Sequence, residues 1–234
     1  MNTNGKKRWA SICLGIMCCL TICAAQIERK QLFNDGWRFV LGEVEGASEL
    51  EFDDASWREL TLPHDWSVES DFNEKESSGN DGGYVVTGIG WYRKSFHLPA
   101  SVQGKRMALY FEGVYMNSEV FVNGHSVGVR PYGYSSFMYD ITPYVKTGAE
   151  NVVAVRVDNS KQKNCRWYTG AGIYRHVWLL TTDALHIAHW GTFITTPEVN
   201  AEQAMVQVEV KIKNEAEALK NANVFVNLKK EGTI

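Results

Sequence analysis

The chain has 234 residues, a formal net charge of −3, and eight Trp, ten Tyr and ten Phe. Charges of both signs are interspersed, so no basic stripe is present and nucleic acid is excluded as a partner. Of the five cysteines only Cys165 lies beyond residue 25, which excludes an intrachain disulfide scaffold and a cysteine metal cluster in the rest of the chain. We expect no metal and no cofactor.

The N-terminus has the pattern of a secretory signal peptide. A basic start precedes an uncharged apolar run from Ala10 to Ala25, and the run ends in small residues. Because this run is short for a bilayer span, we expect residues 1–25 to be removed, leaving no membrane span, and the protein to be periplasmic or extracellular. Lipid anchoring at Cys23 is a lesser alternative, since bulky Ile22 stands where a small residue is expected.

Short alternating runs of apolar and polar residues predict an all-β, antiparallel protein. Helical periodicity is almost absent, and each run is bounded by Gly, Pro, Asn or Asp. Asn123-Gly124 predicts a tight hairpin, because Gly accepts the positive φ that such turns require. Residues 67–90 are expected to form a long loop. The predicted strands are residues 91–98, 107–112, 119–122, 151–157 and 177–180.

A domain boundary is expected near Asp183. Residues 26–183 form the first predicted domain, and residues 184–234 restart the strand pattern with the runs LHIAHWGTFITTP, AMVQVEVKIKN and ANVFVNLKKEG. An immunoglobulin-like sandwich would need about four strands more. We therefore expect the chain to be a fragment or a truncated product whose second sandwich is incomplete.

The sequence Gly124-His125-Ser126-Val127-Gly128 matches the nucleophile elbow of esterases. That elbow requires a strand, a sharp turn and a helix, whereas this glycine follows a hairpin asparagine and no helical pattern comes after it. We interpret Ser126 as a hairpin serine.

Two further matches to metal-binding patterns are weak. His186 and His189 are expected on opposite faces of a strand, where they cannot share a metal. The run Asp71–Lys75 resembles a calcium loop, but Gly82 stands where the twelfth, acidic position should be.

Arg166, Trp167 and Tyr168 form the first candidate binding segment. They precede a turn containing Gly170 and Gly172, and a plain surface loop would avoid Trp. The crowding predicts a loop that presents side chains to a ligand.

The segment Leu62-Pro63-His64-Asp65-Trp66 is the second candidate. It places an imidazole, a carboxylate and an indole at the head of the long loop. A binding role for Asp65 and a turn-capping role are equally well supported here. Trp91 and Arg93, on one face of the next predicted strand, are interpreted as scaffold.

Six ordered motifs between Leu32 and Leu180 carry a family resemblance. They resemble the N-terminal part of glycoside hydrolase family 2, with the β-galactosidase branch as the best match. The motifs are FNDGWRF, LPHDW, GIGWYRKSFHLP, YFEGVYMNSEVFVNGHSVG, YGYSSFMYDITPYV and RWYTGAGIYRHVWL.

The resemblance implies a jelly-roll sugar-binding domain, an immunoglobulin-like domain and then a catalytic barrel. In such enzymes two barrel glutamates perform a retaining hydrolysis, and the acid/base Glu typically follows an Asn. The two Asn-Glu pairs here, at Glu74 and Glu215, lie before any barrel. We therefore expect no catalytic residue in this chain and no hydrolysis by it alone.

The resemblance also implies that jelly-roll loops complete the pocket for a terminal β-linked sugar. Arg166 and Asp65 would hydrogen-bond to hydroxyls, and Trp167 or Tyr168 would stack on the sugar. Alternatively, Arg166 and Asp65 pair with each other and join two loops. A β-glucuronidase or β-mannosidase portion, or a stand-alone carbohydrate-binding module, is the alternative function.

Overall fold

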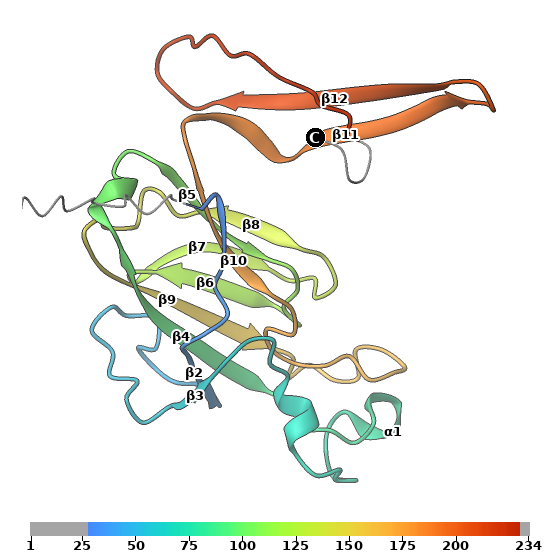
Figure 1. Ribbon diagram of the computed structural model, residues 1–234. Coiled ribbons are helices and arrows are strands. Elements are labelled where there is room, and N and C mark those ends of the chain that lie inside the picture. Colours follow the sequence, from blue (N-terminus) through green and yellow to red (C-terminus); the bar gives the residue numbers. More distant parts are fainter. Residues whose placement is uncertain (1–27, 230–234) are drawn as a thin grey trace, which may run out of the picture.

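The computed structural model describes residues 28–229; the expected signal peptide at 1–25 lies outside them. Regular structure in this part is mostly antiparallel β-sheet (Figure 1), which confirms the predicted all-β class. None of its helices is long and apolar enough to cross a membrane. The helical turns are η1 (Trp66–Glu69), α1 (Gly79–Gly82) and η2 (Ala100–Val102).

The larger sheet has six strands in the order β3-β2-β4-β9-β6-β7. Its central strand β4 pairs with β9 from Ile89↔Asp158 to Leu98↔Ala149. This long pairing makes β4 and β9 the central strands of the larger sheet. The strands are β2 (Trp37–Leu41), β3 (Arg58–Leu60), β4 (Ile89–Leu98), β6 (Ser118–Val122), β7 (His125–Arg130) and β9 (Ala149–Asp158).

The smaller sheet has four strands in the order β1-β10-β5-β8. Side chains alternate along each strand, so one face of each sheet is apolar and the two apolar faces pack on each other. Tyr92 and Val155 of the larger sheet and Leu109 and Phe111 of the smaller one are fully buried there. The strands are β1 (Lys30–Leu32), β5 (Arg106–Phe111), β8 (Phe137–Asp140) and β10 (Val177–Thr182).

The outer face of β4 is also covered, by the segment 42–57. Trp91 packs with Ala47 in a small second cluster. Arg93 is 1% exposed, and its guanidinium donates to Asp54 Oδ2 at 2.9 Å and to the carbonyl of Glu49 at 3.0 Å. Trp91 and Arg93 thus lie on one face and act as scaffold, as predicted.

The hairpin between β6 and β7 turns at the predicted position. Asn123 and Gly124 have φ values of 49° and 84°, the positive values of a tight hairpin turn. Ser126 lies in β7 and donates to the Glu119 carboxylate. No helix follows it as far as residue 229, so the nucleophile-elbow interpretation is rejected.

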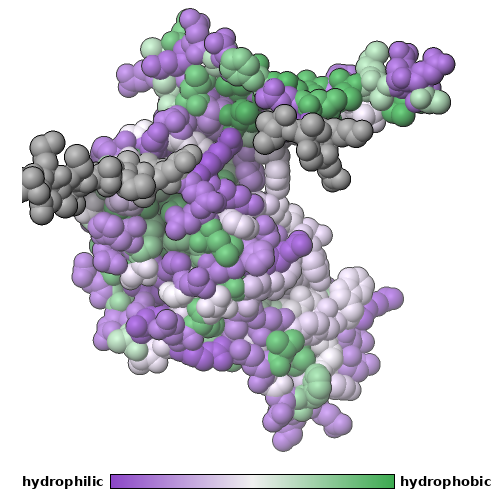
Figure 2. Space-filling model, in the orientation of Figure 1, coloured by the Kyte–Doolittle hydropathy of each residue, from purple (hydrophilic) through white to green (hydrophobic). Residues whose placement is uncertain are grey.

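A second hairpin, β11 (Leu185–Val199) and β12 (Ala204–Asn214), projects beyond the sandwich (Figure 1). The predicted third strand is wrong, since residues 215–229 contain no strand. A strand requires a hydrogen-bonded partner, and this run has none among the described residues. Apolar surface therefore stays exposed along the hairpin (Figure 2), including Phe193, Ile194 and Met205.

The expected opposite orientation of His186 and His189 is also wrong. The register jumps from Ile187↔Ile212 to Thr192↔Val210, so β11 carries extra residues in a bulge. Trp190 in this bulge has a φ of 53°. A bulge changes the direction of the side chains that follow it, and both histidines line the same cavity.

Candidate functional site

Asp65 joins two loops at one end of the sandwich. Its Oδ1 accepts hydrogen bonds from the backbone N–H of Ser67 and of Ala171, each at 2.9 Å. Its Oδ2 accepts a hydrogen bond from the Tyr168 hydroxyl. Asp65 is therefore both the cap of η1 and the anchor of the loop that contains the predicted binding segment.

The hydrogen bond to Asp65 fixes the chemical form of Tyr168. Burial and the neighbouring Asp65 carboxylate raise the pKa of the phenol well above its usual 10.0. Tyr168 consequently stays protonated and acts as a donor. Its ring is still 42% exposed, so one edge remains available to a ligand.

Gly172 lets the anchored loop approach the core. It has a φ of +99°, and a Cβ there would lie 2.1 Å from the Tyr92 hydroxyl and 2.9 Å from the His64 carbonyl. Its N–H and C=O exchange hydrogen bonds of 2.9 Å with Tyr115. The glycine is required for both its positive φ and its close contacts.

We expect Gly172→Ala to destabilise the protein by roughly 2–4 kcal/mol, because positive φ strain adds to overpacking. Urea unfolding followed by Trp fluorescence measures this loss. Gly36→Ala is the matched control: Gly36 also has a positive φ of +67°, but nothing lies within 4 Å of its Cβ position. Equal losses for both variants would show that crowding at Gly172 is unimportant.

His64 lies behind this loop and is 8% exposed. Its Nδ1 lies 2.7 Å from the Tyr92 hydroxyl, and Arg58 Nη2 lies 2.7 Å from its Nε2. Burial lowers the pKa of His64 below its ordinary 6.5. The imidazole is thus a neutral structural link between the loop 62–66 and β4.

The lowered pKa predicts a pH dependence of stability. Below pH 6.5 the unfolded chain binds a proton at His64 before the folded protein does, so stability falls as pH falls from about 7 toward the folded pKa. We expect His64→Gln to lose less stability than wild type between pH 7.5 and 5.5 in urea titrations. Since burial also lowers the pKa of His189, the difference between the two proteins isolates His64. If the difference in unfolding free energy between wild type and His64→Gln is the same at pH 7.5 and pH 5.5, the prediction is contradicted.

The remaining predicted residues lie on the outside of the anchored loop. Trp167 is 61% exposed, and Arg166 beside it is exposed too. Arg166 does not pair with Asp65, whose oxygens are occupied by Ser67, Ala171 and Tyr168. The loop 159–171 and α1 project from the same end of the sandwich (Figure 1).

Tyr134 is a neighbour of Trp167 that sequence reasoning missed. Trp167 Nε1 donates to the Tyr134 hydroxyl at 3.4 Å, and the rings of Tyr132 and Tyr134 are 5.7 Å apart. The signal was present in the motif YGYSS, which places two tyrosines around Gly133. We call Tyr132, Tyr134, Trp167 and Tyr168 the aromatic patch.

The aromatic patch suits a sugar better than a charged or purely apolar ligand. Exposed rings offer flat apolar faces, and Tyr and Trp also carry polar groups at their edges. Arg166 adds a planar donor beside the patch. The arrangement can bind and orient a polyhydroxylated ring.

Neither glutamate that follows an asparagine belongs to this site. Glu74 is exposed in the long loop. Glu215 lies next to the second hairpin and pairs with Lys213 at 2.6 Å.

A β-sandwich with exposed aromatic side chains at one loop end is an arrangement that suits a carbohydrate-binding domain. Residues 31–183 match the family description "Glycosyl hydrolases family 2, sugar binding domain". The chain belongs to glycosyl hydrolase family 2, and the resemblance found in the sequence is confirmed.

Two curated relatives show the range of enzymes to which the chain is similar. It is 50% identical to a β-galactosidase of Bacteroides ovatus over 196 residues, which cover 84% of this chain and 23% of the relative. It is 40% identical to a putative β-glucuronidase of Formosa agariphila over 220 residues, 94% of this chain and 21% of the relative. The chain thus spans under a quarter of the length of these relatives.

Solved structures agree with the sequence comparison. A β-glycosidase from Bacteroides vulgatus superposes with a TM-score of 0.78 at 41% identity, covering 82% of this chain and 25% of that one. A family 2 member from Bacteroides cellulosilyticus gives a TM-score of 0.77 at 44% identity, covering 79% and 24%.

Proposed function

We propose that this chain is the N-terminal, non-catalytic portion of an exported retaining β-glycosidase that hydrolyses terminal β-galactosides. The observation that carries the proposal is the 50% identity to a β-galactosidase over most of the chain. The β-galactoside enters a catalytic barrel supplied outside these residues, and the aromatic patch closes one side of its pocket.

Within this proposal the site residues have different tasks. Trp167 and Tyr134 offer exposed rings to the sugar, and Arg166 donates to its hydroxyls. Asp65 acts through Tyr168, which it holds in place as a donor. The predicted roles of Arg166, Trp167 and Tyr168 in binding are kept, and that of Asp65 becomes one of positioning.

A β-glucuronidase is the second candidate. The putative β-glucuronidase relative aligns with 94% of this chain, and an exposed Arg166 suits a carboxylate as well as a hydroxyl. Nitrophenyl β-galactoside and nitrophenyl β-glucuronide, given to the complete gene product, separate the two. Turnover of the galactoside at least tenfold faster in kcat/KM supports the proposal, and the reverse order supports the alternative.

The chain of 234 residues is expected to turn over neither substrate. A retaining mechanism needs two carboxyl groups about 5–5.5 Å apart around the glycosidic bond, and the two glutamates that follow an asparagine lie elsewhere. Purified chain incubated with nitrophenyl β-galactoside measures this. Turnover that disappears on a Glu or Asp substitution within the chain would overturn the non-catalytic assignment and favour an enzyme.

A stand-alone carbohydrate-binding module is the remaining alternative. Such a module would bind galactosides tightly without a barrel, whereas a domain that only completes a pocket would not. Isothermal titration of the chain with methyl β-galactoside distinguishes the two. A Kd below about 1 mM, which corresponds to more than about 4 kcal/mol of binding free energy, favours the module.

A further inference from the structure

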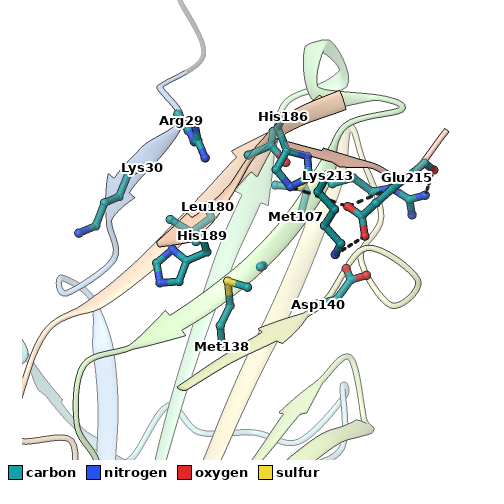
Figure 3. A pocket seen from close by; sticks show the side chains of 13 residues that line it. Arg29, Lys30, Met107, Met138, Asp140, Leu180, His186, His189, Lys213 and Glu215 are labelled. Carbon is teal, nitrogen blue, oxygen red and sulfur yellow. Dashed lines mark hydrogen bonds and ion pairs between the residues drawn. The ribbon is translucent and has the colours of Figure 1, made fainter. Parts of the chain in front are cut away.

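A cavity lies between the outer face of the smaller sheet and the hairpin β11–β12 (Figure 3). It involves none of the residues of the aromatic patch. Its volume is about 160 Å³. A cavity of about 150 Å³ holds one benzene ring, so this one has room for a single small ring.

The floor of the cavity is apolar. Side-chain alternation puts Leu180 of β10 and Ala108 of β5 side by side on the outer face, with Met138 of β8 on the same face. Met138 is 42% exposed, although a methionine on a sheet would normally be covered. An apolar ligand body would bury this surface.

The rim of the cavity is cationic. Four basic residues and two acidic ones line it, with both histidines: Arg29, Lys30, Arg106, Lys213, Asp140, Glu215, His186 and His189. The Glu215 carboxylate pairs with Lys213 at 2.6 Å, and its backbone carbonyl accepts from Arg106 at 2.7 Å. On the side of the cavity formed by Lys213 and Glu215, the charged groups are therefore already bound to one another.

Arg29 and Lys30 have no carboxylate partner among residues 28–229. The Arg29 guanidinium donates to the Ile187 carbonyl, and Lys30 Nζ lies 3.9 Å above the Trp178 ring. Neither cation is therefore neutralised by a direct ion pair in this part of the chain, although Asp140 lines the same cavity. Figure 3 shows them on the side opposite Lys213 and Glu215.

His189 lies on the same side as these two cations (Figure 3). Its ring centroid lies 4.5 Å from that of Tyr110 and 4.7 Å from that of Trp190, with the planes tilted in both pairs. The Nε2 atom is buried and has no hydrogen-bond partner within residues 28–229. A buried polar atom without a partner costs about 1–3 kcal/mol, and a ligand acceptor that reaches Nε2 would remove this cost.

We propose that this cavity binds a small organic carboxylate with an apolar body the size of one ring. The body lies on Leu180, Ala108 and Met138. The carboxylate lies toward Arg29 and Lys30 and accepts a hydrogen bond from His189. The ligand thereby links the hairpin to the sandwich, because its contacts come from both.

Benzoate is the probe, and benzamide is its neutral control of the same shape. With the full chain carrying ¹³C-methyl methionine, we expect benzoate to shift the Met138 methyl signal saturably, and benzamide to bind at least tenfold more weakly. Comparable binding of both, or no saturable shift, would overturn the proposal. So would an equal effect of sulfate, since it lacks the apolar body.

Two variants test the geometry. Arg29→Gln should weaken benzoate about tenfold, the effect of one charged hydrogen bond, and Ala108→Leu should abolish binding by filling the floor. Lys161→Gln, an exposed lysine on the distant loop, removes the same charge and should change nothing. If Ala108→Leu does not fold, the comparison of Arg29→Gln with Lys161→Gln still decides, and equal affinities would overturn the proposal.

Discussion

Arg93→Met is expected to destabilise the protein by about 3–5 kcal/mol, the usual loss when one partner of a buried ion pair is removed. Arg93 is 1% exposed and is bound to Asp54 and to carbonyls of the segment 42–57. Without the guanidinium, these carbonyls lose their donor in a covered position, and the Asp54 carboxylate keeps only its 3.5 Å contact with Arg38. Chemical denaturation at neutral pH measures the loss.

Arg156→Met is the matched control for that experiment. Arg156 also pairs with a carboxylate, that of Glu43, but the two side chains are 26% and 51% exposed. An exposed pair contributes only about 0–1 kcal/mol. Similar losses in the two variants would show that the segment 42–57 does not depend on Arg93.

Trp167→Ala in the complete enzyme is expected to lower kcat/KM by about one to two decades, or roughly 1.4–2.7 kcal/mol of transition-state binding. Because Trp167 is 61% exposed, its removal leaves no core cavity and the melting temperature should stay within about 1–2 °C of wild type. Kinetics with the preferred nitrophenyl glycoside and a thermal scan measure both quantities.

Val129→Ala is the control for Trp167→Ala. Val129 is an exposed apolar residue on the edge strand β7, at 58% exposure, and it lies outside the aromatic patch. The Val129→Ala substitution should change neither kcat/KM nor the melting temperature. If Trp167→Ala lowers the melting temperature and leaves kcat/KM of the folded enzyme unchanged, the aromatic patch is scaffold and not part of the sugar site.

Local signals in the sequence predicted much of the sandwich. The expected strand 91–98 is the core of β4, and the expected strand 151–157 lies within β9. The tight turn at Asn123-Gly124 was also predicted correctly from the sequence. In each case alternation or turn chemistry acts over a few neighbouring residues, so no distant partner was needed to recognise it.

The errors arose where a distant partner decides the structure. Residues 222–229 have the composition of a strand but form none, because a strand needs a neighbour to complete its hydrogen bonds. The bulge before Thr192 turned His189 into the same cavity as His186, and no residue pattern marked it. Such features depend on register against β12.

The sequence by itself determined the all-β class, the family, and the loop that carries Arg166, Trp167 and Tyr168. Only the tertiary structure decided which residues Asp65 and Tyr134 contact. The capping bond from Asp65 to Ser67 spans two residues and could be read locally, whereas its bonds to Tyr168 and Ala171 span more than a hundred. Tyr134 likewise meets Trp167 across 33 residues. Contacts of this length exist only after the two sheets have packed, because the burial of their apolar faces brings the loops together.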